Sequence, residues 1–253
     1  MGTVFQNYPK EKRAFINPED VTKRNADFPE RCVSTFSENI INKFATLDGV
    51  EVIAYLYTAN GRTPVYQFIY RETPIAFYLS KVGAPACAAG LEEVIAMGAK
   101  KILLFGSCGI LNRAADDKII IPVSAVRDEG TSYHYLEAAD EVSADAGVIE
   151  RLTVCFERCG HPYVKGKTWT TDAIYRETAA VIAERKEMGC LCVEMECAAA
   201  MAVAKFRGIP FAQFLYGADN LDSGSWEPRD LTEYGLSGAE KYMALAFEGV
   251  LAL

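Results

Sequence analysis

Short apolar runs alternate with amphipathic stretches along most of this chain. The runs are rich in β-branched and aromatic residues, and turn signals such as Asn60-Gly61 separate them, which is typical of strands. The amphipathic stretches end at glycines, which often stop a helix. Strands are expected at 50–57, 65–70, 75–80, 101–106, 118–126, 163–171, 190–195 and 209–219. Helices are expected at 84–100, 143–160, 176–189, 197–208 and 238–253, with Ser143 capping the second.

The order of these elements predicts a single α/β domain. Strands and helices take turns through the second half of the chain, which favours a largely parallel or mixed sheet with helices packed on it. Continuous apolar runs such as 101–106 indicate strands that are buried on both faces. Residues 1–30 are polar and hold three prolines, so we expect an N-terminal arm there and the domain at 31–253.

The length, composition and net charge of the chain exclude several classes of protein. A chain of 253 residues, half of them apolar and 24% charged, has enough material for one large core. The formal net charge of −8 argues against nucleic acid or an anionic membrane as the main partner. No apolar run approaches the ~20 residues that span a membrane, and the N-terminus lacks the apolar segment of a secretion signal. The sequence therefore predicts a cytoplasmic protein.

Eight cysteines raise the question of a metal site. Cys155, Cys159 and His161 lie close together, and Cys190 and Cys192 form a C-x-C pair. However, no C-x2-C pair occurs, and the chain has only two histidines. Most of the cysteines sit among small apolar residues, where a reduced thiol behaves as a small hydrophobic side chain. We therefore expect buried free thiols in a reducing compartment, and no metal.

Polar residues follow three of the apolar runs, at places where strands are expected to end. In open α/β sheets, ligands bind beyond the carboxyl ends of the strands. The first such stretch is Gly106-Ser107-Cys108-Gly109, where the glycines let the backbone approach an anion and the Ser107 hydroxyl adds a donor. A tight turn after the strand explains the same residues equally well.

The second stretch, Glu194-Met195-Glu196, places two acids among apolar and small residues. One carboxylate can accept both hydroxyls of a vicinal diol such as that of a ribose, and the polarizable methionine suits the apolar face of a sugar ring. A helix N-terminus, which favours acids through its dipole, explains Glu196 without any ligand. Both interpretations fit the residues alone.

The third stretch, GADN (217–220), ends an otherwise apolar run with Asp219. Partial burial at that place would raise the pKa of the Asp219 carboxyl, so that it could hold a proton at neutral pH and act as a general acid. An Asp-Asn turn, which is common after strands, is the plainer interpretation.

Taken together, the motifs resemble those of nucleoside phosphorylases of the purine/uridine type. They occur in that family's order and spacing: GSCGIL (106–111), VRDEGTSYHYL (126–136), TWTTDAIY (168–175), VEMECAA (193–199) and GADN. The resemblance covers roughly Cys32 to the C-terminus and implies one α/β domain, in which helices wrap a distorted, barrel-like mixed sheet. It also implies an enzyme that cleaves the bond between ribose and base with phosphate as the nucleophile. Members of the family commonly form dimers, trimers of dimers or hexamers.

The resemblance assigns five residues to the nucleoside. Glu196 matches the acid that accepts the ribose 2′- and 3′-hydroxyls, Met195 matches the residue packed under the sugar, and Glu194 matches the first acid of the motif. Trp169 stands where purine-type members place an aromatic ring that stacks on the base. Asp219 matches the acid that protonates the purine at N7.

The resemblance is less complete at the phosphate. Ser107 with Gly106 matches the phosphate-binding turn, and Arg62 resembles the arginine that reaches phosphate across the subunit interface. The family's Gly-Asp-Pro loop and the arginine after it have no counterpart in VSTFSENI (33–40), and Leu104 stands where the family has a further arginine. Inorganic phosphate is the implied co-substrate, and no cofactor is expected.

The leading hypothesis is therefore phosphorolysis of purine nucleosides to free base and ribose 1-phosphate by a homo-oligomer, a dimer or a hexamer. Uridine phosphorylase is an alternative, although the chain reads IYRETAA (174–180) where uridine-type members carry a Gln-x-Arg pair for the pyrimidine. A nucleosidase that uses water on the same fold and a non-catalytic nucleoside-binding protein are the other two alternatives.

Overall fold

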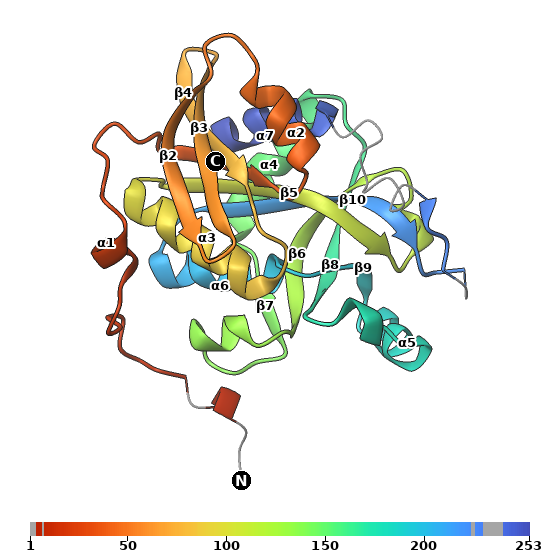
Figure 1. Cartoon of the computed structure of the whole chain (residues 1–253). Coiled ribbons are helices and arrows are strands. Elements are labelled where there is room, and N and C mark those ends of the chain that lie inside the picture. Colours follow the sequence, from red (N-terminus) through yellow and green to blue (C-terminus); the bar gives the residue numbers. More distant parts are fainter. Residues whose placement is uncertain (1–3, 7, 224–225, 230–239) are drawn as a thin grey trace.

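The computed structural model of the chain describes residues 4–6, 8–223, 226–229 and 240–253 (Figure 1). Within them, one sheet has the strand order β10-β6-β8-β9-β5-β1-β4-β3-β2, and β7 pairs with β6. The first five strands are β1 (Arg31–Thr35), β2 (Glu51–Thr58), β3 (Gly61–Tyr70), β4 (Thr73–Leu79) and β5 (Lys101–Ile110). The other five are β6 (Ile119–Asp128), β7 (Glu141–Ser143), β8 (Tyr163–Thr171), β9 (Cys190–Glu194) and β10 (Phe211–Asn220).

One half of the sheet closes on itself, because β10 pairs with β5 as well as with β6. β5 runs parallel to β1 and β10 and antiparallel to β9. The strands β10, β6, β8, β9 and β5 thus form a closed barrel, and β1, β4, β3 and β2 continue from β5 as an open sheet. The expected barrel-like mixed sheet is confirmed.

Helices cover both faces of the sheet. They are α1 (Pro18–Val21), α2 (Glu38–Ala45), α3 (Ala84–Met97), α4 (Ala146–Arg158), α5 (Ala179–Glu187), α6 (Cys197–Arg207) and α7 (Glu240–Ala252). In β5, Leu103 and Phe105 belong to a core cluster with residues of α2, α4 and α7. Ile102 and Leu104 belong to a second cluster with residues of α3 and α6. Alternate residues of a strand point to opposite faces, so β5 is buried on both sides, as its continuous apolar run predicts.

The start of α4 differs from the prediction. The helix begins at Ala146, and its capping residue is Asp145, whose Oδ1 accepts a hydrogen bond from Val148 N at 2.8 Å. Ser143, the predicted cap, ends the short strand β7 instead. An aspartate and a serine both cap helices well, so the sequence alone did not separate the two positions.

The predicted helix at 176–189 is also shorter in the structure. α5 begins at Ala179, because Thr178 Oγ1 accepts from Val181 N and a single 3-10 turn precedes it. The last predicted helix is present as α7, and its first two predicted positions, 238–239, lie outside the described residues.

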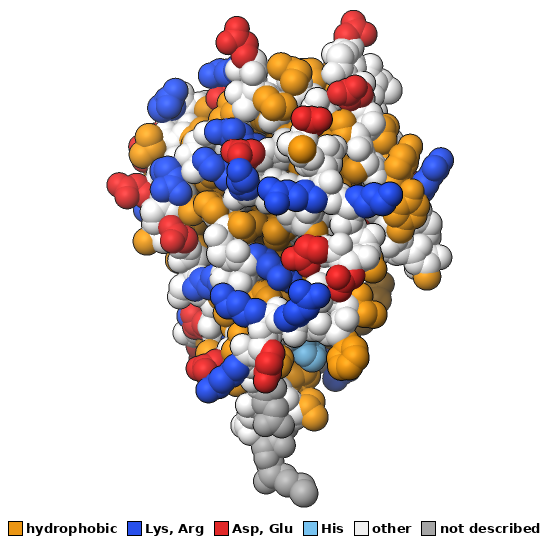
Figure 2. Space-filling model, turned by 90° about the vertical axis from the view of Figure 1, so that its left-hand side faces the viewer, with side chains coloured by type: hydrophobic (Ala, Val, Ile, Leu, Met, Phe, Trp, Pro, Cys, Tyr) orange, Lys and Arg blue, Asp and Glu red, His pale blue; other side chains and the backbone are white. Residues whose placement is uncertain are grey.

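The N-terminal arm runs over the outside of the domain (Figure 1). It holds a 3-10 turn (Val4–Gln6) and α1, and Asn25 N donates a hydrogen bond to Met97 O at the end of α3. Figure 2 shows the side of the molecule that carries the arm, where lysine and arginine side chains gather across the middle with acidic side chains among them. β1 begins at Arg31, and the boundary at residue 30 stays a prediction.

All eight cysteines are free, and every one except Cys159 is buried, as expected for thiols used as small apolar side chains. Among the described residues, no group of three or more His, Cys, Asp or Glu side chains is arranged to hold a metal ion. In the same part of the chain, no helix has the length and apolar character needed to cross a membrane. A reducing compartment stays a prediction.

Candidate functional site

The three polar stretches identified in the sequence meet at the rim of the barrel. In the strand register, Asp219 of β10 pairs with Gly109 of β5, and Gly109 pairs with Val193 of β9. Glu194 at the end of β9 pairs with Thr170 of β8. The ends of four strands therefore lie side by side and bring GSCG, VEME and GADN together, as the expected topology requires.

Glu194 is held by four donors from the protein itself. The side chain is 6% exposed, and its Oε1 accepts from the hydroxyls of Thr170 at 2.6 Å and Thr168 at 3.3 Å. Its Oε2 accepts from the backbone N of Glu196 at 2.7 Å and of Cys197 at 2.6 Å. These amides begin α6, where backbone N–H groups lack partners within the helix. Glu194 therefore caps α6, and four donors use the acceptor capacity of its carboxylate.

Glu196 has a different role, although it is the N-cap residue of α6. Its side chain makes no capping hydrogen bond, and its Oε1 accepts from Gly83 N, just before α3, at 2.6 Å. Gly83 has a φ of 97°, a conformation that favours glycine. Glu196 is 4% exposed, and Met195 lies half-buried between the two acids. The helix-dipole explanation thus applies to Glu194, and Glu196 is the acid that is suited to a ligand.

Burial raises the pKa of both glutamates. For Glu194, the hydrogen bonds from Thr170 and from the backbone of Glu196 and Cys197 oppose the shift. For Glu196, the negative charge of Glu194 adds to the effect of burial, and the Gly83 N–H opposes it. Burial and the nearby charge therefore favour the protonated form of Glu196. A ligand that donates hydrogen bonds to Glu196 favours its charged form.

Asp219 interacts electrostatically with a second carboxyl, that of Glu177. Asp219 is 8% exposed, and burial raises the pKa of its carboxyl, while a 2.9 Å hydrogen bond from Trp226 Nε1 to Oδ2 opposes that shift. Burial and the charge of Asp219 raise the pKa of Glu177, in the loop before α5, to about 7. Glu177 can therefore carry a proton near neutral pH, and the raised pKa of Asp219 is a shift in the direction that a general acid requires.

The predicted anion turn is covered by an aromatic ring. Gly106 is buried, and a Cβ built on it would lie 2.7 Å from Cδ2 of Phe36, so only glycine fits beneath this ring. Ser107 is half-buried, and Leu104, two residues before Gly106, is buried in the apolar cluster with α3 and α6. The expected turn after the strand is wrong, because β5 continues to Ile110 and pairs with β10 through Gly106 and Ser107. The stretch offers the Ser107 hydroxyl, and the phenyl ring of Phe36 limits the space above Gly106.

Arg62 does not lie with the other predicted site residues. It is exposed on β3, and its guanidinium carbon stacks over the ring of Tyr55 at 4.7 Å from the centroid. β1 and β4 separate β3 from β5, which places the two strands about 14 Å apart. Within one chain Arg62 is thus remote from Ser107, and its expected action on the phosphate of a neighbouring subunit stays a prediction.

Trp169 points away from the acids. Thr168 and Thr170 contact Glu194, so the residue between them on β8 faces the opposite side. Trp169 is 1% exposed, its Nε1 donates to Asp128 Oδ2 at 2.9 Å, and it packs in a separate apolar cluster. This position does not support the expected stacking of Trp169 on a base, which stays untested.

Five residues that interact with the predicted acids were not predicted from the sequence. They are Thr168, Thr170, Gly83, Glu177 and Trp226. The threonine contacts could have been predicted from the sequence, because Thr168, Thr170 and Thr171 put hydroxyls on a strand beside the paired acids. Gly83, Glu177 and Trp226 lie in loops, where the spacing of residues along the chain says little about which of them meet.

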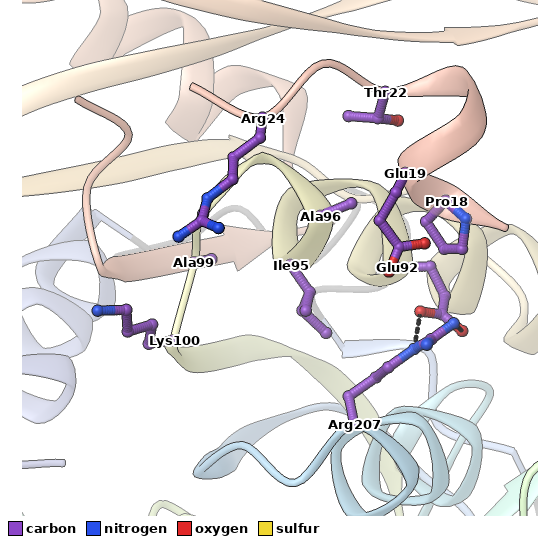
Figure 3. Close-up of a pocket in the computed structure, with 11 residues that line it drawn as sticks. Pro18, Glu19, Thr22, Arg24, Glu92, Ile95, Ala96, Ala99, Lys100 and Arg207 are labelled. Carbon is purple, nitrogen blue, oxygen red and sulfur yellow. Dashed lines mark hydrogen bonds and ion pairs between the residues drawn. The ribbon is translucent and has the colours of Figure 1, made fainter. Parts of the chain in front are cut away.

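A separate cavity of about 390 Å³ lies beside α1 and the last turns of α3 (Figure 3). Arg207 and Glu92 face each other there, with Nε to Oε2 at 2.5 Å and an NH2 group to Oε1 at 3.0 Å. Arg24 and Lys100 line it as well. Lys100 immediately precedes β5, so this cavity lies at the amino end of that strand, whereas the acids gather at its carboxyl end.

Comparison with known proteins places the whole domain in one family. The sequence pattern of the phosphorylase superfamily matches residues 32–246. A guanosine phosphorylase from Halorubrum lacusprofundi is 23% identical over 203 residues, which cover 78% of this chain and 84% of that protein. A DeoD-type purine nucleoside phosphorylase from Aliivibrio salmonicida is 25% identical over 165 residues, 63% of this chain and 69% of that protein.

Solved structures share the fold. A uridine phosphorylase from Vibrio fischeri has a TM-score of 0.73 at 22% identity, covering 90% of this chain and 92% of its own. A purine nucleoside phosphorylase from Toxoplasma gondii, in complex with immucillin-H, also has a TM-score of 0.73, at 19% identity and with 100% and 97% coverage. Since the family pattern spans most of the sequence and the folds agree, this chain belongs to the phosphorylase superfamily.

Proposed function

We propose that this protein cleaves the N-glycosidic bond of purine nucleosides with inorganic phosphate and releases the free base and ribose 1-phosphate. The observation that carries the proposal is the burial and hydrogen bonding of the Glu196 carboxylate. It is a buried carboxylate that caps no helix and has Gly83 N–H as a donor on one oxygen. Two vicinal hydroxyls are the donors that such an acceptor lacks. Relatives named guanosine phosphorylase and purine nucleoside phosphorylase support this choice of substrate.

Ribose binding would place the reacting carbon. The 2′- and 3′-hydroxyls donate to Glu196, and the half-buried Met195 packs against the sugar. Holding the ribose in this way lets an oxygen of phosphate approach C1′ in a fixed geometry, which lowers the entropic cost of the attack. As in other glycosidic cleavages, positive charge develops on the sugar ring as the bond breaks.

Departure of the base needs a proton. When the bond from C1′ to the base nitrogen breaks, its electron pair moves to the base, and a phosphate oxygen forms the new bond to C1′. Asp219 donates a proton to N7 of a purine and so neutralises the charge that builds up there. The neighbouring Glu177 keeps a proton near neutral pH and can support that role. No cofactor enters the reaction.

Purine is favoured over uridine because a pyrimidine has no N7 to receive this proton. The alternative has some support, since a uridine phosphorylase from Thermococcus kodakarensis is 34% identical over 107 residues, 42% of this chain and 39% of that protein. That stretch is short, and the relatives named for purines match over more of the chain.

One observation favours a second candidate, hydrolysis by water. The ring of Phe36 covers Gly106, and the apolar Leu104 occupies the position where the resemblance implies an arginine. Water is small and neutral, so it needs neither the space nor the positive charge that phosphate needs.

The proposal extends to assembly and location. The predicted role of Arg62 requires a neighbouring subunit, so we propose a homo-oligomer, a dimer or a hexamer. Together with the acidic composition, the buried free thiols suit the cytoplasm.

The test is a panel of purine and pyrimidine nucleosides incubated with and without phosphate, with release of free base and of ribose 1-phosphate as the readouts. Phosphate-dependent release of both products from inosine, guanosine or adenosine is the expected result. Equal rates without phosphate would establish the hydrolase. Binding of nucleosides without any cleavage would establish a nucleoside-binding protein, and cleavage of uridine alone would move the assignment to pyrimidines.

A further inference from the structure

Two helices meet at the ribose acid. α3 begins directly after Gly83, and α6 begins directly after Glu196. Gly83 N donates a hydrogen bond to Glu196 Oε1 at 2.6 Å, so the residues that precede the two helices are bonded to each other. The position of the Glu196 carboxylate therefore depends on how α3 and α6 are placed relative to one another.

The same two helices are joined a second time, far from the site. Glu92 lies nine residues after Gly83 in α3, and Arg207 is the last residue of α6, eleven residues after Glu196. At a rise of about 1.5 Å per residue, the two side chains lie about 14–16 Å along their helices from those starting points. Arg207 Nε donates to Glu92 Oε2 at 2.5 Å, and Arg207 Nη2 donates to Glu92 Oε1 at 3.0 Å (Figure 3). The two helices are thus bonded to each other at both ends.

Between these two links, α3 and α6 pack directly against each other. Ala88 and Leu91 of α3 lie in one buried apolar cluster with Ala198 and Met201 of α6. In α6, all of residues 197–204 are buried. Close-packed interiors are stiff and transmit strain, so a shift at one end of this helix pair is carried to the other end.

The Glu92–Arg207 pair is largely buried. Glu92 is 8% exposed, and the guanidinium carbon of Arg207 lies 5.0 Å from the centroid of the Phe206 ring. Pro18 and Glu19 of α1 line the cavity beside the pair (Figure 3). Two parallel hydrogen bonds between an arginine and a carboxylate fix the geometry of both partners. Apolar residues in place of a buried ion pair often leave stability unchanged, so stability alone does not explain this pair.

We propose that Glu92 and Arg207 are positioning residues for nucleoside binding. By fixing the far ends of α3 and α6, they hold the Gly83 N–H and the Glu196 carboxylate in the geometry that receives the ribose hydroxyls. Neither residue contacts the nucleoside in this arrangement. A displacement of about 1 Å in an active site can lower the rate about 10²-fold, so a small shift of either helix is sufficient. This inference rests on the proposed function, because it takes Glu196 as the acid that binds the ribose.

The central test replaces Glu92 with glutamine, which keeps the shape of the side chain and removes its charge. Glu92→Gln should raise the KM for the nucleoside about 5- to 50-fold and leave the KM for phosphate within about threefold, because the ribose acid is the group displaced. Glu248→Gln is the matched control. Glu248 is half-buried on α7 and pairs with Arg71, but α7 is not bonded to Glu196, so neither KM should change. An unchanged KM for the nucleoside in Glu92→Gln would overturn the proposal.

Variants of Arg207 test the geometry of the pair. Arg207→Met should raise the KM for the nucleoside as Glu92→Gln does, and the double mutant should be no worse than either, because both changes break the same link. Arg207→Lys keeps the charge but cannot form two parallel hydrogen bonds, so its KM should lie between those of wild type and Arg207→Met. Independent, additive effects of the two changes would contradict the proposal. If Glu92→Gln does not fold, Arg207→Lys provides the same comparison.

A variant that lacks the ribose acid tests the route of the effect. If the pair acts through Glu196, Glu92→Gln should lower the residual kcat/KM of Glu196→Ala by less than about twofold. A further loss as large as the loss in the wild-type background would mean that the pair does not act through Glu196.

Hydrogen exchange separates this inference from the proposed reaction, because it needs no substrate. The amide of Gly83 should exchange at least about fivefold faster in Glu92→Gln than in wild type, whereas the amide of Leu103, within β5, should keep its wild-type rate. If the wild type binds no nucleoside but Gly83 shows this selective change, the proposed function fails and the link from the pair to Glu196 stands. If both amides change equally, or neither changes, the positioning role is wrong whatever the reaction is.

Discussion

The carboxylate of Glu194 accepts the backbone N–H of Glu196 at 2.7 Å, so the first acid of the pair positions the second. The two glutamates differ in role for this reason. The carboxylate of Glu194 accepts hydrogen bonds from the first backbone N–H groups of α6 and from threonine hydroxyls of β8. The carboxylate of Glu196 accepts one from the backbone N–H of Gly83, just before α3. Glu194 is thus a positioning residue, and Glu196 is the acid that contacts the ribose in the proposed reaction.

Alanine at position 196 should therefore lower activity, whereas alanine at position 194 should lower stability. Glu196→Ala should lower kcat/KM for ribonucleosides about 10²- to 10⁴-fold with little loss of stability, because each hydrogen bond to a charged acceptor contributes about 1.5–3 kcal/mol. Glu194→Ala should lower the free energy of unfolding by about 2–4 kcal/mol, because four buried donors lose their acceptor. Steady-state kinetics and urea denaturation of both variants check this. Near-native turnover in Glu196→Ala would show that this acid does not bind the ribose.

The raised pKa of Glu196 predicts how stability depends on pH. A carboxyl whose pKa is raised on folding binds more protons in the folded state, so its contribution to stability falls as pH rises from its ordinary pKa of 4.5 through the folded value. Glu196→Gln carries no such group and should be more stable than the wild type at pH 9, by at least about 1 kcal/mol. At pH 4 the difference should shrink. Thermal unfolding of both proteins across this range measures it, and parallel curves would contradict the prediction.

Asp219 should control the basic limb of the pH–rate profile. Trp226 donates a hydrogen bond that lowers the pKa of the Asp219 carboxyl, so Trp226→Phe should raise this pKa and move the basic limb to higher pH. Asp219→Asn should abolish the limb and slow inosine cleavage about 10²- to 10⁴-fold. A nucleoside whose base leaves without protonation serves as the control and should be much less affected. Equal slowing of both substrates by Asp219→Asn would assign Asp219 a structural role at the end of β10 alone.

Much of this site could be predicted because strand ends gather polar residues in a recognisable way. Ser107, Glu194 and Asp219 each end or follow an apolar run, and a sheet brings such ends to one rim. The different roles of Glu194 and Glu196 could not be predicted, because they depend on which carboxylate accepts hydrogen bonds from the first amides of α6. That choice is made by the turn at Met195, and the composition of the stretch does not reveal it.

The direction in which the Trp169 side chain points follows from its place on the strand. With period-2 alternation, a strand that turns Thr168 and Thr170 towards Glu194 must turn Trp169 away from it. Trp226, by contrast, has a ring at the site but lies in a loop after β10, where no periodicity applies. Loop residues take their positions from tertiary contacts, so the sequence pattern could not place Trp226 or Glu177.

Arg62 gives a prediction about assembly. If it contacts the phosphate of a neighbouring subunit, inactive Arg62→Ala and inactive Glu196→Ala subunits should recover part of the activity when mixed, because some mixed sites contain both intact residues. Activity is measured before and after subunit exchange, and exchange is confirmed with differently tagged chains. Persistent inactivity after exchange would place Arg62 outside the site.

The contact between Gly106 and Phe36 should be sensitive to a single methyl group. Gly106→Ala puts a Cβ 2.7 Å from the ring, so it should lower the free energy of unfolding by about 1–3 kcal/mol and weaken phosphate binding. Adding Phe36→Leu should recover part of both losses, since the smaller side chain leaves space. A double mutant that is no better than Gly106→Ala would mean that the alanine disturbs strand β5 through its backbone.

The closure of β10 onto β5 also governs when the site can exist. It joins residues that are far apart in the sequence, such as Phe211 and Ile102, so the barrel seam has high contact order and should form late and slowly. Asp219 and Gly109 meet only across this seam. A chain emerging from the ribosome therefore has no complete pocket until nearly all of it has been made, and binding ability reports on the last stage of folding.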